Sequence, residues 1–366
     1  MVELYEAAIS DHADIMALFG RHGFAQQTYA EWIHLWQNNP VLEEINYAWP
    51  IGWVLKNTDS QIVGYFGNYP IPYEFKGKRL IAAVAHAWVV DMEYRKYSIL
   101  LVNSYFRQKE PDLLLNTTGG NPVTQKVFLA YKAQKAPVES YDRSLFSILN
   151  HKEFAVSLFK KKKLPVWLVN NPISSFLFGG FDQISKLQFR FFSFNKQMVQ
   201  QCESFDSKFD IFWEELKKQS GKLLCVRNAR QLHWHFNNAI HQKKVWIFKV
   251  EKKNRIVSYA IFIRDDNLEI DLKRVRLVDL QTIENSNDNL LSILSAAKEK
   301  GFKEGVYMIE SIGFDLVKRN IIAHQFTKKR ELTVWPFYSS NDLNLRKELK
   351  KSKVWELSFF DGDGSL

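Results

Sequence analysis

The stretch WVLKNTDSQIVGY, residues 53–65, recurs in the second half of the chain as WIFKVEKKNRIVSY, residues 246–259. In both copies two apolar runs flank a short polar turn, and the second turn is longer by one residue. Apolar runs rich in Val, Ile and aromatic residues on either side of a polar turn predict a β-hairpin. The repeat therefore predicts that one hairpin-centred unit occurs twice.

The elements around the two hairpins recur in the same order. Each hairpin follows a helical pattern rich in Trp and His and precedes a strand, after which come an apolar helical pattern and another buried strand. In the first copy these four elements lie near residues 32–36, 89–92, 99–106 and 113–115. In the second copy they lie near residues 233–235, 277–280, 290–297 and 306–309. This order predicts an α/β fold with two mixed-sheet units in tandem.

Length and composition also indicate two domains. A chain of 366 residues exceeds the usual length of one domain, and 46% hydrophobic residues suffice for two cores. We predict an N-terminal unit over residues 1–150, a basic and aromatic linker over 151–200, and a C-terminal unit over 201–366.

The net charge of +10 favours anionic partners, which include cofactor phosphates, nucleotide-linked substrates, nucleic acid and acidic lipid. The two cysteines, Cys202 and Cys225, form no disulfide or zinc-binding pattern, and this indicates a reducing compartment. The first residues lack the basic and apolar pattern of a secretory signal. We therefore expect a cytoplasmic protein.

An uncharged stretch, residues 164–181, follows four consecutive lysines at 160–163. Two prolines and the Gly179-Gly180 pair within it argue against a membrane-spanning helix. Contact of this basic and apolar segment with a membrane surface stays open as an alternative. No nucleic-acid-binding motif accompanies the lysines, so we expect no nucleic-acid partner.

The stretch VDMEYRKYSIL, which begins at Val90, has the order of a strand end, a basic turn and a helix start. Backbone amides at a helix N-terminus can bind a pyrophosphate. The stretch resembles the cofactor loop of the GNAT acetyltransferase superfamily, V-x-P-x-x-R/Q-x-x-G-x-G/A, with Val90 and Arg95 at matching positions. It departs from that loop at Met92, Ser98 and Leu100, which replace the proline, the first glycine and the small last residue.

The resemblance covers about residues 4–148 and, more faintly, about residues 205–320. Residues 116–137 are similar to the superfamily's N-x-x-A and Y-x-K-x-G-F segment, with Tyr131 at the tyrosine. The second copy has neither arginine nor glycine in the turn after Asp279, so we assign cofactor binding to the first copy alone. The histidine- and tryptophan-rich pattern at 232–236 and the C-terminal segment 355–363 resemble tandem GNAT proteins of surface-polysaccharide or peptidoglycan precursor synthesis.

The resemblance implies acetyl-CoA as co-substrate and Tyr131 as the acid that protonates the leaving thiolate. We select His86 as the base for the acceptor amine, because an imidazole can take that proton and small alanines surround it. The residues expected to bind the cofactor are Val89, Val90, Arg95, Lys96, Tyr97, Ser98, Ile99 and Asn121. Those expected to bind the substrate are Asn116, Thr117, Asp361 and Asp363.

The predicted function is N-acetyl transfer to the amine of a small polar acceptor, with a nucleotide-linked amino sugar of surface-polysaccharide synthesis as the favoured acceptor. Two alternatives remain, an aminoacyl-tRNA-dependent transferase that builds peptidoglycan bridges and a non-catalytic GNAT-like scaffold. We expect no metal, because His233, His235 and His241 lack a carboxylate at helical spacing. The sequence also lacks the nucleophile elbow, Walker loop and dinucleotide fingerprint of hydrolases, NTPases and Rossmann oxidoreductases.

Overall fold

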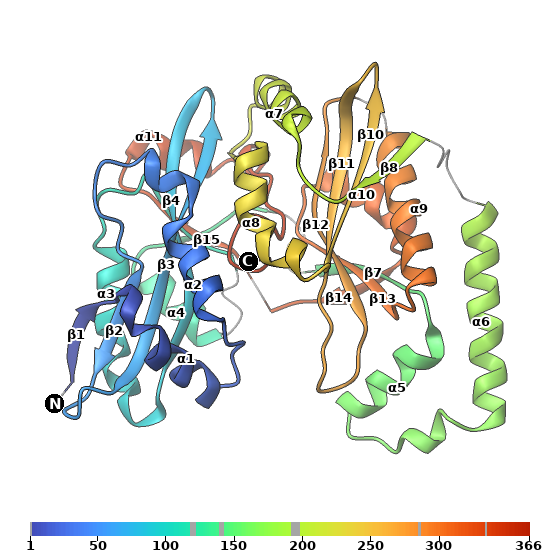
Figure 1. The fold of residues 1–366 in the computed structure, drawn as a ribbon, viewed down its shortest axis with the longest axis horizontal. Helices are drawn as coiled ribbons and strands as arrows, with labels where there is room; N and C mark the ends of the chain where they lie inside the picture. The colour runs from blue at the N-terminus through green and yellow to red at the C-terminus, as the bar shows by residue number, and fades with distance from the viewer. Residues whose placement is uncertain (1, 118–121, 139–142, 192–197, 285–286, 334) are drawn as a thin grey trace.

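The computed structural model describes residues 2–117, 122–138, 143–191, 198–284, 287–333 and 335–366. Two mixed sheets stand side by side in this part of the chain, each covered by helices (Figure 1). The predicted α/β class and the two tandem mixed-sheet units are thus confirmed.

The first sheet has the strand order β1-β2-β3-β4-β5-β15-β6, and β9 pairs with β3. Its strands are β1 (Glu3–Glu6), β2 (Gly52–Lys56), β3 (Ile62–Phe75), β4 (Lys78–Val90), β5 (Leu113–Asn116), β6 (Gln134–Lys135), β9 (Leu224–Cys225) and β15 (Phe337–Ser339). Its helical elements are η1 (Ile9–Asp11), α1 (His12–Arg21), α2 (Tyr29–Gln37), η2 (Pro40–Glu43), η3 (Met92–Tyr97), α3 (Ser98–Phe106), α4 (Pro122–Ala130) and α11 (Leu343–Leu349).

The second sheet has the order β14-β7-β13-β12-β11-β10-β8. Its strands are β7 (Arg143–Ile148), β8 (Val199–Cys202), β10 (Val245–Lys252), β11 (Arg255–Arg264), β12 (Arg274–Thr282), β13 (Met308–Ile312) and β14 (Lys328–Glu331). Its helices are α5 (His151–Lys161), α6 (Pro172–Phe191), α7 (Ser207–Gln219), α8 (Ala229–His241), α9 (Asn287–Lys303) and α10 (Leu316–Gln325), with short turns η4 (Val166–Leu168) and η6 (Ser352–Val354).

Both predicted hairpins are present, as β2–β3 and β10–β11. Each is followed by an antiparallel strand, β4 or β12, that also pairs in parallel with the next strand of its unit, β5 or β13. A parallel pair needs a crossover connection, and α3 and α9 supply it. The duplicated order read from the sequence is therefore the order of the fold.

Three short strands join the sheet of the other half of the chain. β7, within the stretch 1–150 assigned to the first unit, pairs with β13 and β14 of the second sheet. β9 and β15, within the stretch 201–366, pair with β3 and β5 of the first sheet. The stretch predicted as a linker forms α5, η4 and α6. The two halves are thus interlaced within their sheets, because β7 lies between β13 and β14 and β15 lies between β5 and β6.

The helices α2 and α8, equivalent in the two copies, meet at the interface between the units. His34 Nε2 donates to the Trp234 carbonyl at 2.9 Å, and the Trp234 indole donates to the His34 carbonyl at 3.2 Å. One hydrophobic cluster runs through this interface and includes Trp32, Phe209 and Trp355. The two units therefore share a core.

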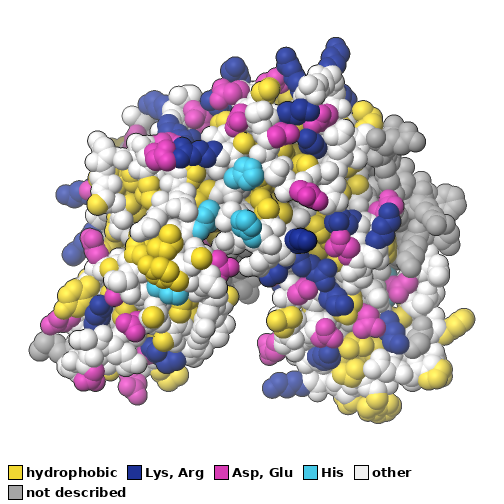
Figure 2. Space-filling model, in the orientation of Figure 1, with side chains coloured by type: hydrophobic (Ala, Val, Ile, Leu, Met, Phe, Trp, Pro, Cys, Tyr) yellow, Lys and Arg dark blue, Asp and Glu magenta, His cyan; other side chains and the backbone are white. Residues whose placement is uncertain are grey.

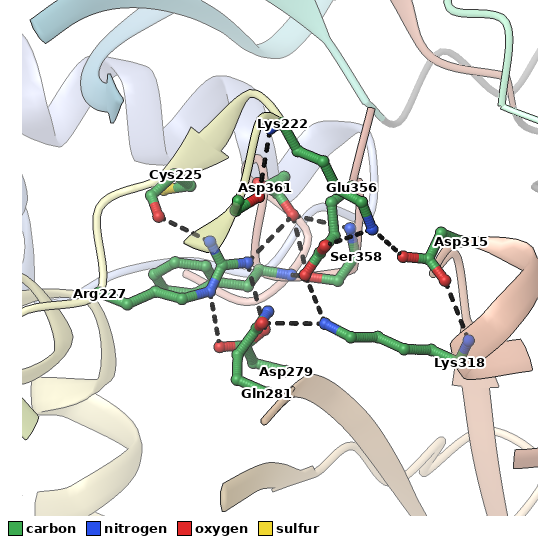
Figure 3. Close-up of polar contacts among 12 residues, drawn as sticks. Lys222, Cys225, Arg227, Asp279, Gln281, Asp315, Lys318, Glu356, Ser358 and Asp361 are labelled. Carbon is green, nitrogen blue, oxygen red and sulfur yellow. Dashed lines mark hydrogen bonds and ion pairs between the residues drawn. The ribbon is translucent and has the colours of Figure 1, made fainter. Parts of the chain in front are cut away.

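Arg227 is a fully buried cation at the centre of this shared region (Figure 3). Its Nε donates to Asp279 on β12 at 2.9 Å, and its guanidinium also donates to the Cys225 carbonyl at 2.6 Å. Asp361 lies 3.7 Å from the guanidinium and accepts the Ser358 backbone N–H at 2.7 Å. Burial raises the pKa of Asp361 to about 6. The arginine thus ties β9, β12 and the C-terminal segment together.

A second buried ion cluster lies beside it (Figure 3). Lys318 on α10 pairs with Glu356 and donates to Gln281 at 2.8 Å, while Lys222 pairs with Glu356 at 2.8 Å and with Asp315. Burial alone would raise the pKa of Glu356, but the two lysines hold it well below its usual range. The C-terminal segment is therefore held by ion pairs at two points, Glu356 and Asp361.

We predict that Arg227→Met lowers the free energy of unfolding by about 3–5 kcal/mol, because it leaves two buried carboxylates without their cation. Urea denaturation measures the loss. Arg255→Met is the matched control, since Arg255 makes a surface pair with Glu215 and is 64% exposed; it should cost at most about 1 kcal/mol. Equal losses in the two variants would contradict this role for Arg227.

Candidate functional site

The strands β4 and β5 pair only over a short stretch and then diverge. Ala82–Val84 of β4 pair with Leu113–Leu115 of β5, whereas β4 continues to Val90. The register between β3 and β4 shifts between His86 and Val89, and Ala87 has a φ of 45°. An extra residue of this kind is a β-bulge, which bends the strand. The bulge and the divergence together leave a gap beside the end of β4.

The backbone of Val90 points into that gap. The Asp91 N–H donates to the Val63 carbonyl at 2.8 Å, so Asp91 is a hydrogen-bonded position of the ladder between β3 and β4. Because such positions alternate along an antiparallel pair, the N–H of Val90 points away from β3, toward the side on which β5 lies. An amide donor at this point can bind a carbonyl oxygen placed in the gap.

The end of β4 leads through η3 into the N-terminus of α3. The side chains of Arg95 and Lys96 are exposed, Tyr97 is half-buried with the Lys96 ammonium 5.1 Å from its ring centre, and Ser98 begins the helix. The side chain of Ile99 is also exposed, so the first turn of α3 faces solvent. The Ser98 N–H donates to the Arg95 carbonyl, so the exposed charge at this point comes from the two cations, which suit a phosphate group.

Asp91 fixes the end of β4 to α1. Its carboxylate accepts hydrogen bonds from Arg21 and His22, both at 2.8 Å. Partial burial alone would raise the pKa of Asp91, but these two hydrogen bonds hold it below its usual range. The sequence analysis did not single out Arg21 or His22, because their contact with Asp91 spans about 70 residues of chain.

A cleft of about 500 Å³ lies between the two units on the α1 side of the first sheet. Figure 2 shows histidine side chains near the middle of this face, above the hollow between the units. The cleft is lined by both units and by the C-terminal segment. Its polar residues are Gln26, Gln27, Glu31, His86, His235, Asn238, Gln242, Lys244, Asp265, Arg276 and Ser365.

His86 lies in the cleft next to a carboxylate. Its Nδ1 is 3.1 Å from Asp363 Oδ2, and its ring packs on Tyr69 at a centroid distance of 4.7 Å. A carboxylate at Nδ1 fixes the ring so that Nε2 is available to a substrate. Sequence analysis selected His86 and Asp363 separately, for catalysis and substrate binding, and the structure brings them together as a pair.

Tyr131 lies on the other face of the first sheet. Its hydroxyl donates to Asn103 on α3, and its ring stacks on Phe106 with centroids 4.7 Å apart. Burial raises its pKa. Because His86 is on the α1 face and Tyr131 packs with α3, the two residues are separated by the sheet at the gap between β4 and β5.

The other predicted substrate residues do not line this cleft. Asn116 is buried at the end of β5, and its Oδ1 has no hydrogen-bond partner among the described residues. Thr117 packs on Gly362 so closely that a Cβ there would lie 1.8 Å from Thr117 Oγ1. Asp361 is buried with Arg227. Asn121 lies outside the residues that the structure describes.

No protein-family model and no curated protein matches this sequence. Solved structures do match. The N-myristoyltransferase of Saccharomyces cerevisiae with bound myristoyl-CoA has a TM-score of 0.58 at 10% identity, over 92% of this chain and 82% of the other. A GCN5-related N-acetyltransferase from Anabaena variabilis has a TM-score of 0.54 at 11% identity, over 94% and 74%. The chain has the GNAT-superfamily fold.

A third match, a GCN5-related N-acetyltransferase from Kribbella flavida, has a TM-score of 0.54 at 9% identity, over 93% of this chain and 71% of the other. All three structures cover both units, so the GNAT fold extends over the whole doubled architecture. The helices of the described segments include none long and apolar enough to cross a membrane. Over the same segments no group of His, Cys, Asp and Glu side chains is arranged to hold a metal ion.

The second GNAT-like unit has the same diverging strands, but its gap is filled. β12 pairs with β13 only up to Leu277, just before a bulge at Val278. The Phe360 N–H donates to the Val278 carbonyl at 3.3 Å, and Ser358 bridges to Gly313 just after β13. The chain's own C-terminal segment therefore lies between the diverging strands of the second unit.

His235 is a cleft residue that sequence analysis considered only as a metal ligand. Its Nε2 donates to Ser365 Oγ at 2.8 Å, because that hydroxyl donates onward to the Phe359 carbonyl. Burial lowers the pKa of His235 to about 3. The signal in the sequence was its place three residues after Leu232, which puts both side chains on one face of a helix.

We predict that His235 makes folding sensitive to acid. The unfolded histidine binds a proton below about pH 6.5, whereas the folded one stays neutral until about pH 3, so unfolding takes up a proton in that window. Stability should fall as the pH decreases from about 6.5, by up to about 1.4 kcal/mol per pH unit from this residue. His235→Gln should lack this component of the slope in urea denaturation, while the exposed His241→Gln should keep it. An unchanged slope in His235→Gln would refute the assignment.

Proposed function

We propose that the chain transfers an acyl group, with acetyl as the first candidate, from acyl-CoA to the amine of a small polar acceptor. The observation that carries the proposal is the divergence of β4 from β5 in the first unit, which lies between the N-terminus of α3 and the cleft of His86. The closed gap of the second unit supports a single cofactor site.

The residues at the gap fit a CoA thioester. Arg95 and Lys96 at the N-terminus of α3 would bind the pyrophosphate, as cations and helix N-termini bind phosphate. The backbone along Val89 and Val90 would bind the pantetheine arm and place the Val90 N–H at the thioester oxygen. The leucine at position 100 and the serine at 98 are larger than the residues of the GNAT loop, so the pyrophosphate would bind farther from the backbone.

The acceptor would enter from the cleft, where His86 Nε2 takes the proton of its ammonium group and Asp363 stabilises the imidazolium. The freed amine attacks the thioester carbon, the C–S bond breaks, and the amide leaves on the cleft side. Tyr131, on the opposite face, would give its proton to the thiolate, and the second proton that the nitrogen loses as the amide forms would return to the Tyr131 phenolate through solvent. The base, His86, and the acid, Tyr131, would then lie on opposite sides of the gap.

The lining of the cleft supports a nucleotide-linked amino sugar as acceptor. Amide side chains such as Gln27 and Asn238 suit sugar hydroxyls, and Gln27 Oε1 is buried without a partner among the described residues. Lys244 suits a phosphate, and Glu31 suits an ammonium group, while Arg276 pairs with Asp265 at 2.8 Å. The named neighbours are an N-myristoyltransferase and two N-acetyltransferases, so the shared fold alone selects neither the acyl donor nor the acceptor.

The first experiment is a calorimetric titration with acetyl-CoA, which should show saturable binding. The melting temperature of the protein should also rise with the concentration of acetyl-CoA. Arg95→Ala/Lys96→Ala should weaken binding about tenfold or more through the loss of two charge-assisted contacts. Lys328→Ala/Lys329→Ala, two exposed lysines of β14, is the matched control for net charge and should bind as the wild type does.

If the chain bound neither acetyl-CoA nor a longer acyl-CoA, the proposal would be wrong. The non-catalytic scaffold or the tRNA-dependent transferase would then be favoured. Binding of a longer acyl-CoA alone would correct the donor. With a bound donor, thiol release on addition of a nucleotide amino sugar, compared with its N-acetylated form as control, tests the acceptor.

We predict that Asp363→Asn lowers kcat by about tenfold to a hundredfold and moves the acidic limb of the pH profile, because the imidazolium loses its carboxylate. The affinity for acetyl-CoA should stay unchanged, as Asp363 faces the cleft. His86→Gln should lose more activity than Asp363→Asn. If Asp363→Asn changed neither kcat nor the pH profile, the pair would have no part in proton transfer.

A further inference from the structure

The helix α6 carries large apolar side chains on an exposed face. Ile173, Phe176, Leu177 and Ile184 are 74%, 83%, 55% and 52% exposed. Their spacing of three, four and eleven residues from Ile173 places them on one side of the helix. A surface helix of a soluble domain normally buries its apolar face. In α6 these apolar side chains are exposed to solvent instead.

The opposite side of α6 is attached to the protein. Asp182 accepts the His151 backbone N–H at 2.8 Å and pairs with its imidazole at 2.7 Å, which fixes α6 to the start of α5. At about 100° per residue, Asp182 lies on the far side of the helix from Ile173 and Ile184. Figure 1 shows α6 at the outer edge of the second unit, away from the first.

Exposed lysines and aromatic groups continue this surface. Lys161, Lys162 and Lys163 are exposed where α5 ends, and no ion pair of theirs is found among the described residues. Trp167 in the following turn is 69% exposed. Tryptophan and lysine are the residues that mark a membrane–water boundary.

A cavity of about 650 Å³ opens beside the same lysines. Phe146, Phe154 and Met308 form an apolar part of its wall, and Lys161 and Lys163 lie on it as well. Apolar walls with cations beside them suit an amphiphilic anion such as an acidic phospholipid.

We propose that α6 lies on the surface of an anionic membrane, with its apolar face in the acyl boundary and lysines 161–163 against lipid phosphates. The charge complementarity of three consecutive exposed lysines and a chain of net charge +10 selects an anionic bilayer over a neutral one. None of these residues lines the cleft of His86, so the surface is independent of the proposed acyl transfer. It would hold the second unit at the membrane.

The test is co-sedimentation of the full chain with vesicles of phosphatidylcholine alone or mixed with phosphatidylglycerol. The mixed vesicles should bind, less tightly as salt rises. Phe176→Glu/Leu177→Glu should weaken binding more than about tenfold, and each Lys→Glu change at 161 or 162 at least about fivefold. Leu343→Glu, at a 75% exposed leucine of α11, is the matched control and should bind normally.

A melting temperature equal to that of the wild type would show that a variant folds. No binding to mixed vesicles, or binding that Phe176→Glu/Leu177→Glu leaves intact, would overturn the proposal. Sedimentation velocity without lipid addresses a second copy as the occupant: a dimer that Phe176→Glu/Leu177→Glu abolishes, with no vesicle binding, would assign the face to self-association instead.

Discussion

The fully buried guanidinium of Arg227 is the constraint on which the arrangement of the two units depends. A buried cation is tolerated only with compensating charge, and here the charge comes from β12 and from the C-terminal segment, Asp279 and Asp361. Tyr259 also donates to Asp279, at 2.8 Å. Because the strand β9 just before Arg227 belongs to the first sheet, one side chain fixes both sheets and the end of the chain in register.

The position of the C-terminal segment decides how the two copies differ. Held by Arg227 and by the lysines around Glu356, it enters the gap of the second unit and then continues to Asp363, beside His86 of the first. The segment that closes one gap therefore supplies the carboxylate beside the other. The two units, although similar in fold, therefore form different walls of one cleft.

Sequence reasoning reached the fold because the evidence for it was local. Hairpins, helices and their order are set by residue patterns over short windows, and the repeat reinforced each pattern by its second copy. The position of Val90 and Arg95 at a strand end and before a helix followed from the same patterns. The pairing of β7 with the second sheet could not be read, since a strand's partner depends on contacts far away in the chain.

The two predicted substrate-binding aspartates lie in different surroundings, for a reason that the local sequence does not show. Asp361 and Asp363 are two residues apart in an acidic, glycine-containing tail, and nothing local distinguishes them. The tertiary structure places the first against a buried arginine and the second against a cleft histidine. Thr117 and Gly362 meet so closely that only a residue without a side chain fits at 362, which explains a glycine between the two aspartates. That contact lets the chain turn from the core into the cleft, so packing at Gly362 positions the carboxylate beside His86.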